Sequence, residues 1–155
     1  MRLWRLSATN YAESFDGGYG LVFNGRWNLV GRPVTYAATV PSLCVLEKLV
    51  HVEDPGLLPD LTTVAYEMPD DIPRHRIEQS GLPADWQRQE ALTQGLGDDW
   101  LRSAGAALLF VPSAILAIDG APDCNVLINH RHPASAGITI AGAEPFALDV
   151  RLFGR

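Results

Sequence analysis

The sequence predicts an α+β fold in which strands dominate and helices are few. Strand-like segments follow one another along most of the chain, and one long amphipathic segment interrupts them early. The order of strand, helix and then several strands differs from the regular alternation of a parallel α/β protein. A length of 155 residues with 47% hydrophobic residues suits one compact domain spanning residues 1–155.

The first half of the chain predicts two strands and one helix. Residues 1–7, MRLWRLS, alternate as a strand requires, and residues 13–20, ESFDGGYG, read as a glycine-rich turn or loop. Residues 33–39, PVTYAAT, predict a second strand because turn-forming residues lie on both sides of them. A helix is expected over residues 41–53, where a proline in the first turn is harmless and a Pro-Gly pair follows the last turn.

The second half predicts mainly further strands. They are expected over residues 61–69, 106–118, 124–133 and 137–153. The second of these is a strand pair or one strand broken at its proline, and the last is a hairpin or two strands. Two prolines and a glycine make residues 70–86 mostly loop, and residues 98–105 predict a short helix capped by an aspartate.

Composition and charge argue against several classes of function. The net charge is −6 without a basic cluster, so no direct nucleic-acid partner is expected. The chain contains no run of about 18 apolar residues, so a membrane span is not expected. The N-terminus does not resemble a signal peptide, and Cys44 and Cys124 form no disulfide framework, so we expect a cytoplasmic protein. The histidines lack a recognised metal-binding spacing, and no metal site is expected.

One charged residue lies within the apolar face of the predicted helix. Leu43, Leu46, Glu47 and Val50 follow the i, i+3, i+4, i+7 spacing of a buried helical stripe. A glutamate is almost never fully buried unless it is paired, and an unpaired carboxylate in an apolar site becomes protonated. The sequence therefore predicts that the fold supplies Glu47 with a cation, with hydrogen-bond donors or with an opening to solvent.

A purely structural reading of Glu47 also fits the sequence. At the border of the stripe the carboxylate would reach water, or it would form a salt bridge with Arg26 or Arg32. His51, four residues later on the helix, is a further pairing partner. On this reading Glu47 serves the fold alone.

Three specialised side chains precede the second strand in GRWN, residues 25–28. Arg26 presents a planar fork that suits phosphate or carboxylate, Trp27 offers a flat face, and Asn28 offers donors and an acceptor. Each of them alone is more often structural. Together, on a loop near an inward-facing acid, they predict a pocket for an anionic ligand.

These residues belong to a longer set of motifs that resembles the RES-domain family, toxins of bacterial toxin–antitoxin pairs. The resemblance covers nearly the whole chain, and the order of GRWN, a Tyr-bearing strand and a LEKLVH helix is specific. The motifs are WR at 4–5, GRWN at 25–28, PVTYAA at 33–38, LEKLVH at 46–51, VPSAIL at 111–116, NVLIN at 125–129 and DVRLF at 149–153.

The resemblance implies a fold similar to that of ADP-ribosyltransferase toxins, with mixed or antiparallel sheets, and NAD as substrate. Family members deplete NAD by cleaving its nicotinamide–ribose bond, by hydrolysis or by phosphorolysis with inorganic phosphate as acceptor. Some instead resemble transferases that modify a host protein. The partner is typically an Xre-type antitoxin whose segment blocks the NAD pocket. A third reading is a non-enzymatic module that only binds its antitoxin, which a closed Arg26–Glu47 pair would favour.

The family is named for an arginine, a glutamate and a serine, which correspond here to Arg26, Glu47 and Ser113. Tyr36 corresponds to a further pocket residue, and the resemblance implies that these four are catalytic. The expected NAD-binding set consists of Arg26 and Tyr36 together with Arg5, Trp27, Asn28 and Asn125.

The chemistry of NAD cleavage gives each residue an expected role. Positive charge develops on the ribose, as in glycoside hydrolysis, and we expect the Glu47 carboxylate to stabilise it. Arg26, with Arg5 as a second candidate, would bind the pyrophosphate. Tyr36 would stack on the nicotinamide ring or donate through its hydroxyl. Ser113 would hydrogen-bond a phosphate, a ribose hydroxyl or Glu47, and the alternative is a strand-end hydroxyl that satisfies backbone groups.

Two segments depart from the family. Residues 119–124, DGAPDC, stand where family members carry a Pro-Glu pair followed by an asparagine, and His130 replaces a proline. We therefore expect altered loop geometry near Asn125, with the arginine, tyrosine, glutamate and serine positions intact. Phosphorolysis would further need an anion pocket, for which Arg26 and Arg32 are the candidates.

Overall fold

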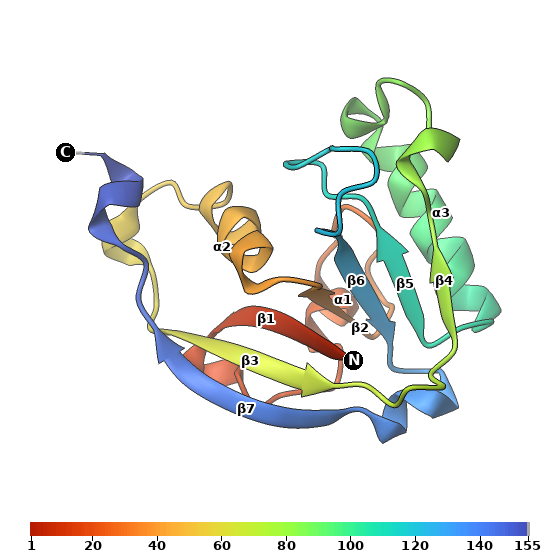
Figure 1. The fold of residues 1–155 in the computed structure, drawn as a ribbon, viewed down its shortest axis with the longest axis horizontal. Helices are drawn as coiled ribbons and strands as arrows, with labels where there is room; N and C mark the ends of the chain where they lie inside the picture. Colours follow the sequence, from red (N-terminus) through yellow and green to blue (C-terminus); the bar gives the residue numbers. More distant parts are fainter. Residues whose placement is uncertain (155) are drawn as a thin grey trace.

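Seven strands form one mixed sheet in the computed structural model, which describes residues 1–154 (Figure 1). The strands are β1 (Arg2–Ala8), β2 (Val34–Ala38), β3 (Leu61–Glu67), β4 (Arg74–Arg76), β5 (Leu108–Val111), β6 (Asn125–Asn129) and β7 (Thr139–Phe146). Their order is β4-β5-β6-β2-β1-β3-β7. The β4–β5 pair is parallel and the other neighbouring pairs are antiparallel. The predicted α+β class is confirmed.

The two longer helices lie on the same face of the sheet. The helices are α1 (Gly18–Val22), α2 (Pro41–Leu49) and α3 (Glu90–Ser103). In α2, Leu43 packs in one cluster with Ala38 of β2, and in α3 Trp100 shares a cluster with Leu127 of β6. Figure 1 shows α2 above β1 and α3 beside β4 and β5. None of the helices in residues 1–154 is long and apolar enough to cross a membrane.

Strand register decides which side chains share the face covered by α2. Residues directly opposite each other in antiparallel strands point to the same side of the sheet. Trp4 lies opposite Ala38, and Ala38 lies opposite Asn125. Side chains alternate along a strand, so Tyr36, two residues before Ala38, also points toward this face. Arg5, the neighbour of Trp4, points to the opposite face.

That opposite face carries the larger apolar core. Its members come from five strands, β1, β2, β3, β5 and β6, and from loops that adjoin the strands. They include Leu3, Ala37, Val64, Tyr66, Phe110, Val126 and Ile138. The sheet therefore separates this core from the face on which α2 presents Glu47.

Most strands and the helix α2 occur where the sequence predicts them. The predicted length of the helix at residues 98–105 is wrong. The helix α3 begins at Glu90 and spans 14 residues. Gly95 and Gly97 weaken its helical signal. Gly97 has a packing reason, because a Cβ there would collide with the backbone oxygen of Trp27.

Three further segments differ from their predictions in physical detail. Residues 70–86 contain β4, a short strand that forms because β5 supplies its backbone partners. Residues 13–20 include the start of α1. Residues 137–153 form the single strand β7 and a 3₁₀ turn (Val150–Phe153) instead of a hairpin or two strands, because β7 pairs along its whole length with β3.

Candidate active site

Helix α2 presents Glu47 beside its buried face. Pro41 occupies the first turn, as expected, and Leu43 and Cys44 are the buried residues of the helix. The predicted stripe is wrong for Leu46 and Val50, whose exposed fractions are 38% and 56%. The helix is rotated because Leu43 and Cys44 pack against β1 and β2, and this leaves the Glu47 side chain half-buried.

The Glu47 carboxylate is held by two neutral donors. Its Oε1 accepts a hydrogen bond from Ser113 Oγ at 2.8 Å and another from Asn125 Nδ2 at 2.5 Å. Ser113 follows β5 and Asn125 begins β6, so the sheet brings both donors to the helix. Within residues 1–154 Glu47 forms no ion pair, and the predicted salt bridges with Arg26 or Arg32 and the His51 pairing are wrong. The carboxylate is therefore fixed but not neutralised.

Ser113 is the junction of this network. It is fully buried, and its oxygen accepts hydrogen bonds from the backbone N–H groups of Ile115 at 3.1 Å and Leu116 at 3.2 Å. With both backbone donors pointing at the oxygen, the hydroxyl proton is directed to Glu47. Ser113 thus satisfies backbone groups and positions the acid at once, as both sequence readings proposed.

Tyr36 faces the same side of the sheet but its hydroxyl is already engaged. The hydroxyl donates to Asn28 Oδ1 at 2.8 Å and accepts from the Trp27 N–H at 3.1 Å. Burial raises the pKa of the Tyr36 hydroxyl, and the negative charge of Glu47 acts in the same direction. The hydroxyl therefore stays protonated, and it is the ring of Tyr36 that is left for a ligand.

The 25–28 turn is anchored to α3. Thr93 Oγ1 donates to the Arg26 carbonyl at 2.7 Å, and Gln94 Nε2 donates to the Gly25 carbonyl at 3.0 Å. A Cβ on Gly25 would lie 2.5 Å from the Tyr36 hydroxyl oxygen, so only glycine permits this approach. The helix, the turn and β2 together form one rigid support for the Arg26 side chain.

Arg26 carries a guanidinium without a carboxylate partner in residues 1–154. Its Nη1 donates to the Gln87 carbonyl at 2.9 Å, and Gln87 Nε2 donates to the Ala114 carbonyl at 2.7 Å. Ala114 is the neighbour of Ser113, so these bonds link the arginine to the loop that holds Glu47. The remaining guanidinium N–H groups are available to an anion.

Trp27 and Asn28 support the site from within the fold, and the structure buries both of these side chains, which the sequence predicts to bind NAD. The Trp27 ring is buried, with its centroid 6.1 Å from that of Trp86. Asn28 is fully buried; its amide nitrogen donates to the carbonyls of Phe23 and Leu29, and its oxygen accepts from Tyr36. The polar groups of the Asn28 side chain are therefore engaged within the fold.

Arg5, the predicted second pyrophosphate ligand, lies on the other face of the sheet from Glu47, so the structure does not bring it next to the carboxylate. Its Nη2 donates to the carbonyls of Tyr11, Ala12 and Ser14, at 2.7, 3.2 and 3.2 Å. The guanidinium carbon lies 5.8 Å from the centre of the Tyr66 ring. Arg5 therefore fixes the loop after β1.

Arg32 is likewise occupied. Its Nε donates to Asp98 Oδ1 at 2.7 Å and its Nη2 lies 3.4 Å from Oδ2. This pair joins the start of β2 to α3 and raises the pKa of Arg32. Arg26, not Arg32, is the candidate anion ligand.

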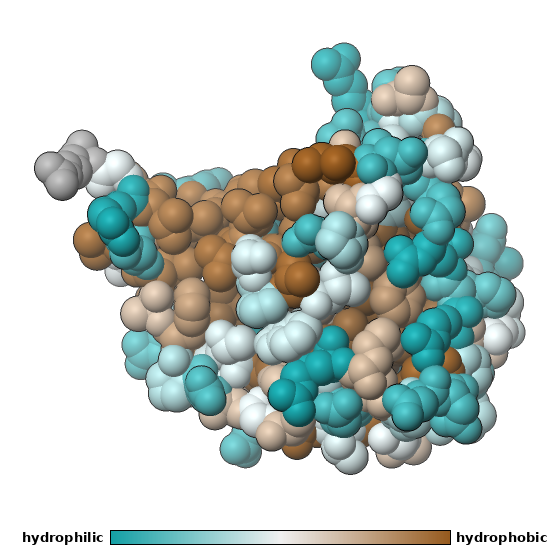
Figure 2. Space-filling view, viewed as in Figure 1, coloured by the Kyte–Doolittle hydropathy of each residue, from teal (hydrophilic) through white to brown (hydrophobic). Residues whose placement is uncertain are grey.

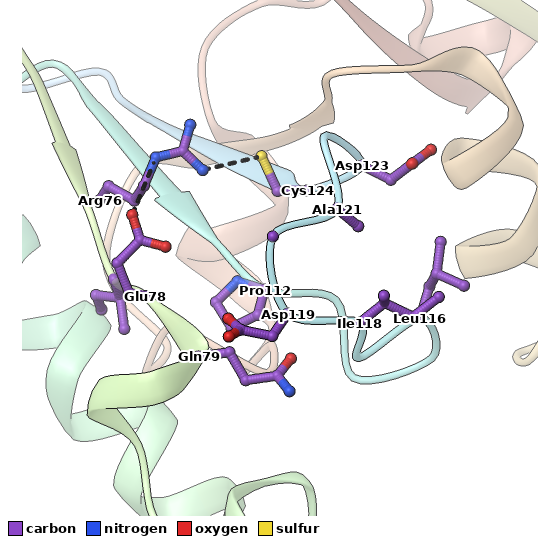
Figure 3. Close-up of a pocket in the computed structure, with 12 residues that line it drawn as sticks. Arg76, Glu78, Gln79, Pro112, Leu116, Ile118, Asp119, Ala121, Asp123 and Cys124 are labelled. Carbon is purple, nitrogen blue, oxygen red and sulfur yellow. Dashed lines mark hydrogen bonds and ion pairs between the residues drawn. The ribbon is translucent and has the colours of Figure 1, made fainter.

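A cavity of about 250 Å³ lies beside the loop of residues 112–124. Figure 3 shows Arg76 joined to Glu78 and Cys124 on one side of it, with Pro112 and Asp119 on the loop. Arg26, Tyr36, Glu47 and Ser113 are not among its lining residues. Across residues 1–154 no three His, Cys, Asp or Glu side chains gather as metal ligands.

The structure thus brings Glu47, Ser113 and Asn125 together directly and links Arg26 to them through Gln87. The sequence did not indicate that Asn125 donates to Glu47. Strand alternation offers a signal, because Asn125 lies opposite Ala38, on the face of Tyr36. Nothing in the local sequence marks Gln87, which approaches the site only through the tertiary fold.

Chemically, the site offers one oriented negative charge, one available guanidinium and the half-buried ring of Tyr36. A carboxylate that keeps its charge stabilises a cationic carbon near it, and a planar guanidinium binds phosphate oxygens bidentately. Fold and site together define a small α+β domain with a preformed carboxylate site.

The chain belongs to the RES toxin family, since the RES domain model matches residues 2–149. It is similar to "Toxin Res" of Pseudomonas putida KT2440, with 42% identity over 99% of this chain and 100% of the relative. It is also similar to "Prs ADP-ribosylating toxin" of Sphingobium sp. YBL2, with 31% identity over 96% of this chain and 94% of the relative. The fold resembles that of the M. tuberculosis MbcT–MbcA toxin–antitoxin complex, with a TM-score of 0.71, 14% identity, and 94% and 84% of the two chains covered.

Proposed function

We propose that this toxin depletes NAD by cleaving its nicotinamide–ribose bond, with residues 1–155 acting as one RES domain. The observation that carries the proposal is the Glu47 carboxylate, which Ser113 and Asn125 hold in place without neutralising it. Nicotinamide leaves as a neutral ring, so the barrier lies in the positive charge that develops on the ribose. A fixed carboxylate beside the ribose lowers that barrier.

The other residues take roles that their contacts allow. Arg26 binds the pyrophosphate through the guanidinium N–H groups that Gln87 does not use. Tyr36 contributes its ring, because its hydroxyl is engaged by Asn28. Ser113 and Asn125 position Glu47 and keep its Oε1 oriented. The absence of an Arg26–Glu47 pair argues against a module that only binds a partner.

The acceptor of the ribosyl group is water or inorganic phosphate. Phosphorolysis places a second anion near the ribose, and Arg26 is the cation at hand, because Asp98 occupies Arg32. The proposed reaction needs no metal.

A second candidate is transfer of ADP-ribose to a protein. The relative named "Prs ADP-ribosylating toxin" favours it, since the similarity spans almost the full length of both chains. The same carboxylate and the same bond cleavage serve both reactions, and they differ only in the acceptor.

We propose an Xre-type antitoxin as the partner that neutralises this toxin in the cytoplasm. Figure 2 shows a continuous apolar band over α2 and the C-terminal 3₁₀ turn. Its exposed members include Leu46, Val50, Val150 and Leu152. Exposed apolar surface of this kind is typical of a protein interface, and it lies on the helix that carries Glu47. The acidic chain itself makes no direct contact with nucleic acid in this proposal.

The test is NAD turnover by the purified toxin, freed of any antitoxin. Nicotinamide release in buffer without phosphate indicates hydrolysis, and release that depends on phosphate indicates phosphorolysis. Incubation of the toxin with labelled NAD and cell extract tests the second candidate, because transfer of ADP-ribose leaves the label on a protein. No NAD loss and no labelled protein would refute the proposal.

A further inference from the structure

Tyr19 is an exposed aromatic residue that the proposed function has not used. It is the second residue of α1, and its exposed fraction is 56%. Its hydroxyl has one long hydrogen bond, of 3.4 Å, to the Asn24 carbonyl. The ring nevertheless has a defined place, because it packs against two other aromatic rings.

The Tyr19 ring is held next to Tyr36. The two ring centroids are 6.4 Å apart and the ring planes are 85° apart. On another side Phe23 packs against Tyr19, with centroids 5.3 Å apart and planes inclined by 35°. Tyr19 and Tyr36 thus form two walls of an aromatic corner, with part of the Tyr19 ring open to solvent.

The backbone fixes this arrangement through close glycine contacts. A Cβ on Gly20 would meet the backbone oxygen of Arg32 and lie 2.5 Å from Val34 Cγ1. Gly17 has a φ of 72°, and a Cβ there would lie 2.5 Å from the backbone of Val34. α1 is therefore pressed onto the start of β2, the strand that carries Tyr36, so the distance between the two tyrosines is set by the fold.

We propose that Tyr19 is a substrate-binding residue that stacks on the pyridinium ring of NAD, an inference that rests on the function proposed above. The nicotinamide ring of NAD is flat and positively charged, and the face of a tyrosine attracts such a cation. Tyr36 lies on the face of the sheet that holds Glu47, since Ala38, two residues later on β2, lies opposite Asn125, which donates to the Glu47 carboxylate. A ring in the corner formed with Tyr19 would thus lie on the side of the sheet where the ribosyl bond breaks.

The chemistry predicts which kinetic constant changes. The pyridinium ring loses its positive charge as the bond to ribose breaks, so its attraction to Tyr19 is strongest before the transition state. Removing the ring should therefore weaken substrate binding without lowering the rate of the chemical step. Tyr19 is for this reason a binding residue and not a catalytic one.

The experiment compares Tyr19→Ala, Tyr19→Phe and the matched control Tyr11→Ala. Tyr11 is also an exposed tyrosine, at 67%, but its side chain belongs to the loop after β1. We expect Tyr19→Ala to raise KM for NAD about five-fold without lowering kcat, while the other two variants match the wild type. The inhibition constant of 1-methylnicotinamide, an uncleavable pyridinium cation, should rise by the same factor in Tyr19→Ala.

Three results would overturn the inference. The first is a Tyr19→Ala variant with the KM and inhibition constant of Tyr11→Ala. The second is a loss of kcat at unchanged KM. The third is a Tyr19→Phe variant as impaired as Tyr19→Ala, because the ring and not the hydroxyl should matter. Failure of the proposed function is a different result, namely a wild-type protein that does not consume NAD, and thermal unfolding verifies that each variant is folded.

Discussion

Replacement of Ser113 by alanine tests the network that holds Glu47. The change removes a hydroxyl that donates to the Glu47 carboxylate at 2.8 Å and accepts from two backbone N–H groups at 3.1 and 3.2 Å. A hydrogen bond to a charged group contributes about 1.5–3 kcal/mol and a neutral one about 0.5–1.5 kcal/mol. Glu47 is half-buried and one of the backbone groups belongs to exposed Ile115, so water recovers part of the loss. We expect a net loss of about 3 kcal/mol.

Two assays read out this change. For a domain of this size, about 1 kcal/mol shifts Tm by about 2–4 °C, so the variant should melt roughly 10 °C below the wild type. Its kcat for NAD cleavage, measured where the variant is folded, should fall about 10- to 100-fold, because Glu47 keeps a single donor, Asn125.

Ser135→Ala is the matched control. Ser135 is also buried, but its hydroxyl makes one hydrogen bond, to the Asn129 carbonyl at 2.7 Å. The Ser135→Ala substitution should lower the free energy of unfolding by about 1 kcal/mol and leave kcat unchanged. A Ser113→Ala variant with a Tm within about 2 °C of the wild type and an unchanged kcat would refute the role assigned to this network.

Three further predictions concern residues away from Glu47. Gly97→Ala should destabilise the protein by more than about 3 kcal/mol in urea unfolding, because its Cβ collides with the Trp27 backbone. Arg32→Ala should lower Tm through loss of the Asp98 pair but leave KM for NAD unchanged. Burial lowers the pKa of His130, so the unfolded state takes up the proton first. The stability that neutral His130 contributes is complete above about pH 6.5 and is lost as pH falls toward the lowered pKa, so His130→Gln should show a smaller drop in Tm on acidification.

Each of these has a clear contrary result. A Gly97→Ala variant as stable as Gly95→Ala, where a Cβ meets nothing within 4 Å, would contradict the packing of α3 on the 25–28 turn. A raised KM for NAD in the Arg32→Ala variant would instead indicate that Arg32 binds the substrate. Equal Tm losses in wild type and His130→Gln would show that His130 does not gain its proton on unfolding.

The sequence was sufficient for the parts of the fold that local patterns encode. Alternation predicts β1, the flanking turn residues predict β2, and Pro41 together with the apolar spacing predicts α2. The length of α3 was not predictable, because Gly97 looks like a helix breaker until Trp27 is placed against it. β4 was missed for a related reason, since its backbone partners belong to β5, far along the chain.

The site shows the same division between local and tertiary information. Motif resemblance and spacing singled out Arg26, Tyr36, Glu47 and Ser113, and the structure connects the last two directly. Arg5 is not brought to Glu47, because strand register, which a sequence without its pairing does not reveal, turns it to the other face. Polar residues near a site indicate ligand binding only when their donor and acceptor groups are not already paired within the fold.

The role of the Glu47 charge is best tested by the rate of nicotinamide release from NAD, compared between the purified toxin and its Glu47→Gln variant. Glutamine keeps the size of the side chain and an oxygen that can accept from Ser113 and Asn125, but it removes the negative charge. We predict that the wild type consumes NAD and that the variant, with nearly the wild-type Tm, loses at least about 100-fold in kcat. A Glu47→Gln variant that cleaves NAD as fast as the wild type would contradict the account, because the carboxylate charge would then not be what stabilises the transition state.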